Sequence, residues 1–176
     1  LFSAPPFDLF NLGDHCGDNP HVVAKNRDAL IQALHLPSAP VWLKQVHGVE
    51  VYEIGVAPIE KPPQADAAIT RIAGAICAVL TADCIPLLLC AEDGSEVAAA
   101  HAGWRGLSTG VIEACIRRMH TAPAQLLAWL GPAIGPAAYE VGEDVRRAFL
   151  TGHSSNVNAF HAARPGHWLC DLYALA

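Results

Sequence analysis

The sequence predicts an α/β fold built around a mixed β-sheet. Short apolar segments typical of strands occur along the chain, and segments typical of helices lie near residues 20–36 and 108–120. Several strand-like segments follow one another between residues 75 and 101 with no helix between them. Because a doubly wound parallel sheet needs a helix after each strand, the pattern favours a mixed sheet.

The first predicted helix begins at Pro20, with Asn19 as its N-cap. Proline is tolerated at the first helical position, because its missing N–H would have no partner in the first turn. The helix should end before Pro37. Its expected apolar face includes Val22, Val23, Leu30 and Leu34.

The other elements are predicted from apolar runs and the turn residues between them. Strands are expected at residues 41–46, 49–54, 75–80, 86–89, 96–101, 126–130 and 168–170, with 75–80 and 86–89 fully buried. Helices are expected from Ser108 or Thr109 to about His120, and over residues 141–150. The apolar run 72–91 is as long as a membrane span, but Thr81, Asp83 and Pro86 interrupt it, so we expect no membrane segment.

The composition is that of one globular domain that does not bind nucleic acid through bulk charge. The chain has 176 residues, of which 52% are hydrophobic, and this length suffices for a core. Its formal net charge is −6 and its basic residues form no run, which disfavours nucleic acid and anionic membranes as partners. The six cysteines form no CxxC motif, so we expect reduced thiols in a cytoplasmic protein.

Both ends of the sequence indicate that this domain, residues 1–176, lacks its natural start and its C-terminal segment. The chain begins with Leu1, and its only methionine is Met119. Residues 171–176 have the pattern of a first helical turn. We therefore expect further chain at both ends.

Three short segments place reactive side chains where predicted strands end. They are Lys44-Gln45-Val46-His47-Gly48, Thr81-Ala82-Asp83-Cys84 and His101-Ala102-Gly103-Trp104-Arg105-Gly106. His47, Cys84 and His101 are the ligand types of a catalytic zinc site, which leaves a fourth position for water. Zinc would lower the pKa of that water and supply a hydroxide. The ligands are widely spaced, so two ordinary polar histidines and a buried thiol are the alternative.

Other polar residues have two interpretations each. Arg105 stands where a helix begins and would bind a phosphate or carboxylate, or simply lie at the surface. Trp104 would stack on a base or fill the core. Asn11 would be a turn residue or a polar contact to substrate. The remaining histidines form no paired motif, which gives multicopper laccase chemistry little support.

The order of several segments resembles that of the YfiH family, also called the laccase-domain or polyphenol oxidase family. These segments are NLGDHCGDNP with VAKNRDAL, VWLKQVHG, QADAAIT, AVLTADCIPLLL, AAAHAGWRGL and GPAIGPAAYEVG, and they cover nearly the whole chain. The resemblance implies that His47, Cys84 and His101 bind zinc, with copper as a possible substitute. It also implies mixed sheets in α/β/β/α layers, related to the cytotoxic necrotizing factor toxins.

The resemblance further implies enzymes of purine nucleosides. The family's activities are phosphorolysis of adenosine, inosine, guanosine and methylthioadenosine, and deamination of adenosine. Its laccase label comes from copper-dependent oxidation of phenols, and some members are linked to editing of peptidoglycan precursors. Two departures stand out: the family's C-terminal CT…FSYR-like segment is absent, and Ala137 or Ala138 replaces a frequent cysteine.

Two mechanisms follow for a zinc enzyme. In deamination, a zinc hydroxide would attack C6 of adenine, and Asp83 would protonate the leaving ammonia or only stabilise its turn. In phosphorolysis, Arg105 would bind phosphate, Lys44 would assist it, and Gln45 would contact the base. The alternatives are a cysteine hydrolase or amidase with Cys84 as its nucleophile, and a non-enzymatic binding subunit.

Overall fold

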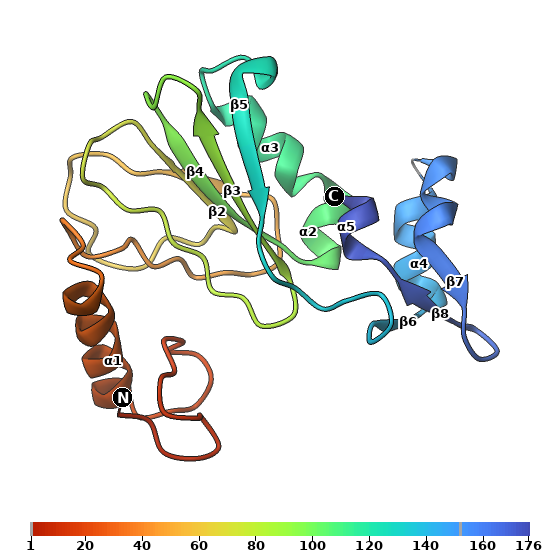
Figure 1. The fold of residues 1–176 in the computed structure, drawn as a ribbon, viewed down its shortest axis with the longest axis horizontal. Coiled ribbons are helices and arrows are strands. Elements are labelled where there is room, and N and C mark those ends of the chain that lie inside the picture. Colours follow the sequence, from red (N-terminus) through yellow and green to blue (C-terminus); the bar gives the residue numbers. More distant parts are fainter. Residues whose placement is uncertain (1, 152) are drawn as a thin grey trace. The chain divides into compact units, whose positions relative to one another are not determined.

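The computed structural model describes residues 2–151 and 153–176 (Figure 1). The chain divides into two compact units, residues 1–40 with 73–76 and residues 41–72 with 77–176. The first unit holds helix α1 (Pro20–Ala33), and the second holds the β-sheets. The single domain expected from the length stays a prediction.

Helix α1 begins where the sequence predicts. The Asn19 side chain accepts a hydrogen bond from the backbone N–H of His21 at 2.9 Å and so caps the first turn. The predicted apolar face is only partly correct, because Val23 is buried whereas Leu34 is 61% exposed. Leu34 lies beyond the last helical residue, which explains its exposure.

A buried amide, rather than more apolar surface, holds α1 to the N-terminal loop. Asn26 donates to Ser3 Oγ at 2.8 Å and to the carbonyl of Asn11 at 2.9 Å. Its side-chain oxygen accepts from the backbone N–H of Phe2 at 3.0 Å. Since Asn26 is fully buried, these bonds compensate the cost of removing its amide from water.

The second unit contains a five-stranded mixed sheet (Figure 1). Its strands are β1 (Val51–Glu53), β2 (Ala67–Thr70), β3 (Ile85–Ala91), β4 (Val97–Ala102) and β5 (Leu126–Leu130), in the order β1-β2-β4-β3-β5. The β1–β2 pair is parallel and the other pairs are antiparallel. The predicted mixed sheet is therefore present.

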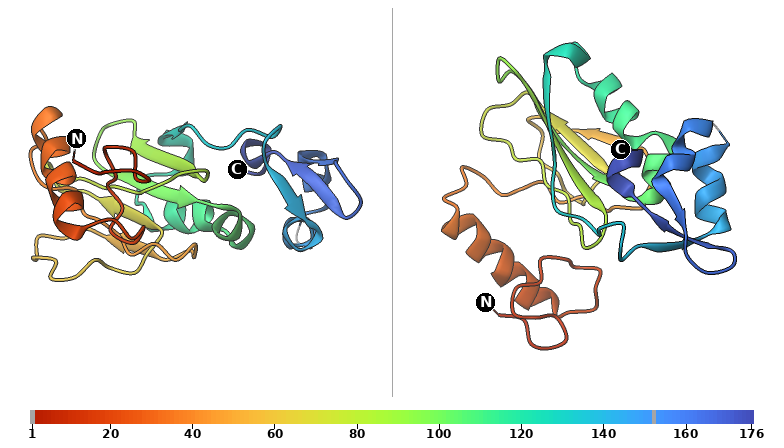
Figure 2. Two further views of the ribbon diagram at one scale, coloured as in Figure 1. Left: turned by 90° about the horizontal axis from the view of Figure 1, so that it is seen from below. Right: turned by 45° about the vertical axis from the view of Figure 1, so that its right-hand side comes forward.

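One face of this sheet packs on helix α3 (Val111–Arg118). Views from two further directions show α3 lying along the sheet (Figure 2). The shared core consists of small and branched side chains from β2, β3 and β4 with two residues at the end of the helix: Ala67, Ile69, Leu87, Leu89, Ala98, Ala100, Cys115 and Met119. Since side chains alternate along a strand, His101 points to the opposite face from Ala100.

The helix expected from Ser108 or Thr109 is two helices. Helix α2 (Trp104–Thr109) starts directly after Gly103, earlier than predicted, and α3 follows it. Gly110 separates them with a φ of 94°, a left-handed conformation that glycine adopts without strain. The earlier start brings the first turn of α2 next to the end of β4.

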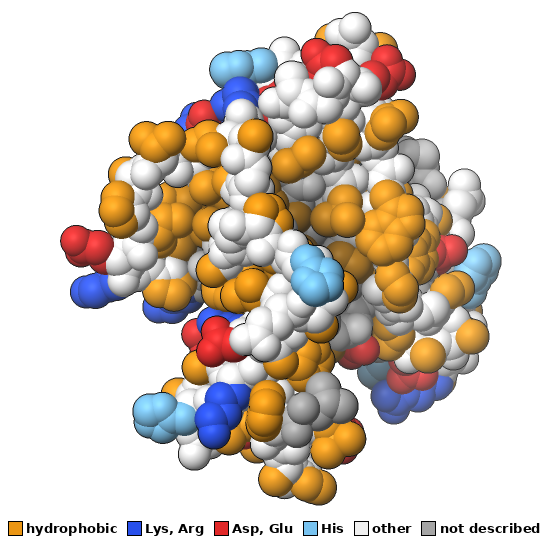
Figure 3. Space-filling model, turned by 60° about the vertical axis from the view of Figure 1, so that its left-hand side comes forward, with side chains coloured by type: hydrophobic (Ala, Val, Ile, Leu, Met, Phe, Trp, Pro, Cys, Tyr) orange, Lys and Arg blue, Asp and Glu red, His pale blue; other side chains and the backbone are white. Residues whose placement is uncertain are grey.

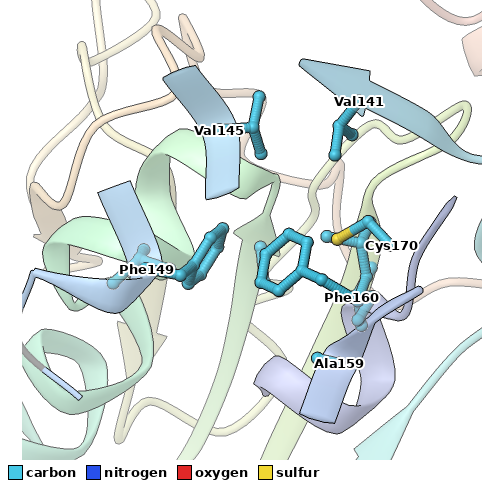
Figure 4. Close-up of a cluster of buried hydrophobic side chains, with 10 residues drawn as sticks. Val141, Val145, Phe149, Ala159, Phe160 and Cys170 are labelled. Atoms are coloured by element: carbon cyan, nitrogen blue, oxygen red, sulfur yellow. The ribbon is translucent and has the colours of Figure 1, made fainter. Parts of the chain in front are cut away.

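The C-terminal part of this unit forms a three-stranded antiparallel sheet, whose core also includes Ile85, Ala102 and Val111 from β3, β4 and α3. The strands are β6 (Glu140–Gly142), β7 (Phe160–Ala162) and β8 (His167–Cys170), in the order β6-β8-β7, accompanied by α4 (Glu143–Leu150), α5 (Leu172–Leu175) and the 3₁₀ turn at Ser154–Ala159. Another 3₁₀ turn, at Pro123–Gln125, directly precedes β5. Phe149 and Phe160 pack with ring centroids 6.1 Å apart in this core (Figure 4).

Several predicted boundaries are wrong. Residues 41–46 and 75–80 form no strand, and only single bridges join Val41 to Cys77 and Lys44 to Gln64. Residues 75–80 are half-buried, not fully buried. In β3, Leu88 is 44% exposed because it lies on the face opposite α3. The helix predicted at residues 141–150 begins at Glu143, since Val141 belongs to β6.

Two further features concern the cysteines and the character of the helices. All six cysteines are free thiols. In the part of the chain that the structure describes, no helix has both the length and the apolar character needed to cross a membrane. On the face drawn in Figure 3, basic side chains lie among acidic and apolar ones.

Candidate metal centre

Four segments of the second unit meet at one edge of the five-stranded sheet. Because β2 and β4 are antiparallel, the segment before β2 lies beside the end of β4, as the Ala67–Ala100 pair shows. The β3–β4 register pairs Pro86 with His101, so the start of β3 is there as well. The parallel β1–β2 pair adds the segment that precedes β1.

This edge brings together the three predicted metal ligands. His47 precedes β1, Cys84 directly precedes β3, and His101 lies near the end of β4. One potential ligand atom from each residue lies within 4.8 Å of the other two, and the two imidazole rings meet edge to face at 4.6 Å. His47 is exposed, Cys84 half-buried and His101 buried, so the group is open on one side. Within the described ranges this is the one group with such ligand spacing.

A carboxylate that we did not single out from the sequence organises the same edge. Asp66 is fully buried and lies immediately before β2. Its side chain accepts hydrogen bonds from three consecutive backbone N–H groups, of Val46 at 3.1 Å, His47 at 2.9 Å and Gly48 at 2.7 Å. These donors form a concave group that favours an anion.

The same carboxylate contacts the ring of His101. Asp66 Oδ1 lies 2.9 Å from His101 Nδ1. Burial alone would raise the pKa of Asp66, but the bonds from His101 and the three backbone N–H groups lower it below its ordinary value. The ionised carboxylate therefore accepts the Nδ1 proton and leaves Nε2 of His101 as the nitrogen available to a metal.

The surroundings of Cys84 disfavour a thiolate when no cation is bound. Burial raises the pKa of the Cys84 thiol, and the negative charges of Asp83 and Asp66 raise it further. A catalytic thiolate needs the opposite, namely a lowered pKa beside a positive charge. A bound cation would itself deprotonate the thiol, so these surroundings fit the donor set of a metal site.

Gly103 leaves the space that the side chains of Cys84 and His47 occupy. A β-carbon at this position would lie 2.8 Å from Cys84 Sγ and 3.2 Å from His47 Cδ2. Both distances are shorter than ordinary contacts, so any larger residue would displace a proposed ligand. The HAGWRG segment thus contributes two features to the site: the His101 side chain, and the absence of a side chain at Gly103.

Asp83 and Arg105 flank the triad. Asp83 is exposed, and its carbonyl accepts from the backbone N–H of Ile134 at 3.0 Å, which attaches the Gly131–Pro136 turn beside Cys84. Arg105 is exposed in the first turn of α2, and its guanidinium lies 4.4 Å from the centroid of the Trp104 ring. This cation–π contact restrains an otherwise mobile side chain.

Of the predicted substrate contacts, Gln45 and Asn11 have other partners, whereas Lys44 lies at the surface. The side-chain amide of Gln45 donates to the carbonyl of Leu80 at 2.8 Å and accepts from the backbone N–H of Leu80 at 2.7 Å. It thus bonds to the Leu80 backbone in the way that the backbone of a neighbouring strand would. Lys44 is exposed. Asn11 belongs to the first unit, where its side chain bonds Gly13 and Asp18. Roles for these residues in substrate binding stay predictions.

Three residues near the triad were not singled out from the sequence. The sequence offers one indication of a role for Asp66, namely that an acidic residue stands directly before an apolar strand. Gly103 lies two positions after His101, and a glycine there indicates that other side chains come close to the backbone. Burial raises the pKa of the Tyr139 hydroxyl to about 12; the charges of Cys170, Cys84 and Asp83 raise it further, and that of Arg105 lowers it.

Comparison with known proteins identifies the family. A family model described as multi-copper polyphenol oxidoreductase laccase matches residues 2–176. The chain belongs to this laccase-like YfiH family. Two relatives are a purine nucleoside phosphorylase of Xylella fastidiosa strain Temecula1, 52% identical, and purine nucleoside phosphorylase YfiH of Escherichia coli, 50% identical. Each match covers 99% of this chain and 70% or 71% of the relative.

Solved structures of the YfiH family show the same fold. A Neisseria meningitidis protein matches with a TM-score of 0.92 and 43% identity. Bacillus licheniformis YfiH matches with a TM-score of 0.90 and 26% identity. Each match covers 98% of this chain and 70% of the other. The predicted fold class, mixed sheets with helices as in the YfiH fold, is confirmed.

Proposed function

We propose that this chain is a metal-dependent enzyme that cleaves purine nucleosides with phosphate. The observation that carries the proposal is the convergence of His47, Cys84 and His101 to within 4.8 Å at one edge of the sheet. The names of the Xylella and Escherichia relatives, both purine nucleoside phosphorylases, support the substrate class. Neither observation depends on the other.

The donor set fits zinc. Thiolate and imidazole are the ligands that zinc prefers, and three protein ligands leave a position open, as in catalytic sites. The exposed side of the group, at His47, would give substrate access. When bound, zinc supplies a Lewis acid that polarises a substrate atom. Copper also accepts thiolate and imidazole, so metal analysis of the purified protein must identify the ion.

The residues beside the triad suit the charges of phosphorolysis. In this reaction a phosphate oxygen bonds to C1′ of the ribose, the C1′–N9 bond breaks, and the purine leaves with a proton. Arg105 is restrained on Trp104 and would bind the phosphate through its fork of N–H donors. Lys44, exposed three residues before His47, would add a second positive charge.

Gln45 has a different assignment from the one expected. Both polar atoms of its amide bond to Leu80, which leads into the Thr81–Cys84 turn. We assign Gln45 to positioning this turn and, through it, Cys84. The second N–H and the second oxygen lone pair of this amide are not used by Leu80, so contact with a base stays a prediction.

The finer predictions concern substrates and a second reaction. Adenosine, inosine, guanosine and methylthioadenosine stay the predicted substrates, and hydrolytic deamination of adenosine stays a predicted side activity. Asp83 is exposed next to Cys84 and would be the proton donor for the leaving ammonia. A cytoplasmic location also stays a prediction.

Product analysis with and without phosphate tests this function. The purified chain is incubated with each nucleoside, and free base, ribose 1-phosphate and deaminated nucleoside are separated by chromatography. We expect base release that requires phosphate and that is lost in Cys84→Ala. The control is Cys16→Ala, which removes an exposed thiol of the other unit.

The possible outcomes separate the alternatives. Inosine formed from adenosine without phosphate would show deamination. Turnover retained in Cys84→Ala would contradict the metal-centred account. Absence of turnover from metal-loaded protein would contradict the proposed substrate class and direct attention to amide substrates or phenols.

A further inference from the structure

One buried carboxylate contacts the segments of both proposed histidine ligands. Asp66 accepts from the backbone around His47 and from the imidazole of His101. The first contact fixes the backbone conformation around His47. The second determines which ring nitrogen of His101 carries the proton.

The contact with the His47 segment stabilises an unfavourable backbone conformation. His47 has a φ of 59°, in the left-handed region that non-glycine residues seldom adopt. This conformation is unfavourable for such a residue, because its β-carbon comes close to a backbone carbonyl oxygen. It turns the N–H groups of Val46, His47 and Gly48 toward Asp66, whose charge offsets the cost.

The contact with His101 determines which ring nitrogen carries the proton. Three backbone N–H groups already donate to Asp66, so its oxygens act as acceptors. Nδ1 of His101, 2.9 Å from Oδ1, must then be the donor. In neutral imidazole the other nitrogen, Nε2, is left with a free lone pair, which is the form that binds a metal.

From this we infer that Asp66 is a positioning residue that prepares both histidines for the metal before the metal arrives. It holds the backbone of His47 in its left-handed turn and fixes His101 as the Nδ1–H tautomer. This inference rests on the proposed metal site. A preorganised pair of ligands binds more tightly, because less conformational freedom is lost on binding.

The first test compares zinc affinity in two matched variants. Asp66→Asn keeps the shape of the side chain but removes its charge and one acceptor. Asp93→Asn makes the same change at an exposed carboxylate that caps the backbone N–H of Ser95 in the β3–β4 turn. Zinc affinity is measured by competition with a chromophoric chelator, and folding by circular dichroism.

We expect Asp66→Asn to bind zinc about 10- to 100-fold more weakly than the parent chain, as is usual when a partner of a ligating histidine is lost. Asp93→Asn should bind zinc as the parent does. If folded Asp66→Asn also binds zinc like the parent, the inference is wrong. If the parent chain binds no zinc or copper, the proposed metal site fails instead.

The second test starts from the parent chain, so its first result does not depend on whether Asp66→Asn folds. Long-range ¹H–¹⁵N spectra of metal-free protein report which nitrogen of each imidazole carries a proton. We expect His101 to show a protonated Nδ1 and a bare Nε2. A protonated Nε2 with a bare Nδ1 would overturn the inference. A purely structural role for Asp66 does not predict a change of tautomer in folded Asp66→Asn, whereas our inference predicts a mixture.

Discussion

Gly103 and Cys84 are packed so closely that a single methyl group on Gly103 would lie 2.8 Å from the Cys84 sulfur. The backbone of Gly103, with φ −78° and ψ 165°, is open to any residue. The requirement for glycine here is therefore a matter of space beside the triad, not of backbone conformation.

Gly103→Ala should accordingly weaken metal binding with little effect on the fold. The added methyl group displaces the sulfur or the His47 ring, and we expect a loss of about tenfold or more in zinc affinity. Gly55→Ala is the matched control, since no atom lies within 4 Å of its β-carbon position. Equal zinc affinities in the two variants would show that the triad accommodates the added methyl group, and would contradict this prediction.

Gln45→Ala should destabilise the turn that carries Cys84. Loss of the two bonds to Leu80 leaves a partly buried backbone pair without partners, at a cost of about 1–3 kcal/mol. Urea denaturation measures the free energy of unfolding. If the variant is as stable as the parent and only its KM for nucleoside rises, Gln45 contacts the substrate after all.

Glu96 and Arg71 form a second charged pair in the sheet unit, away from the proposed ligands. Arg71 Nε lies 3.0 Å from Glu96 Oε2, and the Glu96 side chain is only 1% exposed. Glu96 also accepts from the backbone N–H of Thr121 at 2.6 Å. Arg71 contacts Glu53 as well, at 2.6 Å, which moderates the effect of losing one partner.

We expect Glu96→Gln to lower the free energy of unfolding by about 2 kcal/mol, because it leaves a partly buried guanidinium less well paired. Arg118→Gln removes an exposed partner of Glu53, 3.6 Å away, and should change stability by less than about 0.5 kcal/mol. Zinc affinity should be unaltered in both variants. Equal stability of the two would contradict the importance of burial at Glu96.

Buried thiols predict a loss of stability at alkaline pH. Burial raises the pKa of Cys77, Cys115 and Cys170 from 9.0 to about 12. Between these values the unfolded chain releases protons that the folded chain retains, so the free energy of unfolding falls as pH rises. Below pH 9 both states keep the protons and these groups have no effect.

Denaturation under reducing conditions at several pH values from 7.5 to 11 checks this dependence. The decline should be less steep in Cys115→Ala, although this variant starts from a lower stability because it leaves a small cavity. A stability that rises with pH, or an identical slope in the variant, would contradict the assignment.

Residue type and placement predicted the proposed ligands, but not the network that supports them. His47, Cys84 and His101 each follow or precede an apolar segment, where functional side chains concentrate. Asp66 looked like an ordinary polar residue before a strand, because its four donors come from segments that only the sheet pairing brings near. Long-range pairing is not visible in local sequence.

The fold shows the same limit. The strand at 126–130 and the start of α1 were predicted correctly, since turn residues or a cap bound them. Residues 75–80 are as apolar as a strand, yet only Cys77 finds a partner in a bridge. The break between α2 and α3 depends on the left-handed conformation of Gly110. The spacing of apolar residues continues across this glycine, so it does not reveal the break.

The central claim is that His47, Cys84 and His101 bind one metal ion. Its most direct test is the metal content per chain, by mass spectrometry, of protein purified without added metal, alongside Cys84→Ala and Cys16→Ala. We predict close to one zinc in the parent and in Cys16→Ala, and almost none in Cys84→Ala. A parent chain without metal, or a Cys84→Ala variant that retains it in full, would contradict the account.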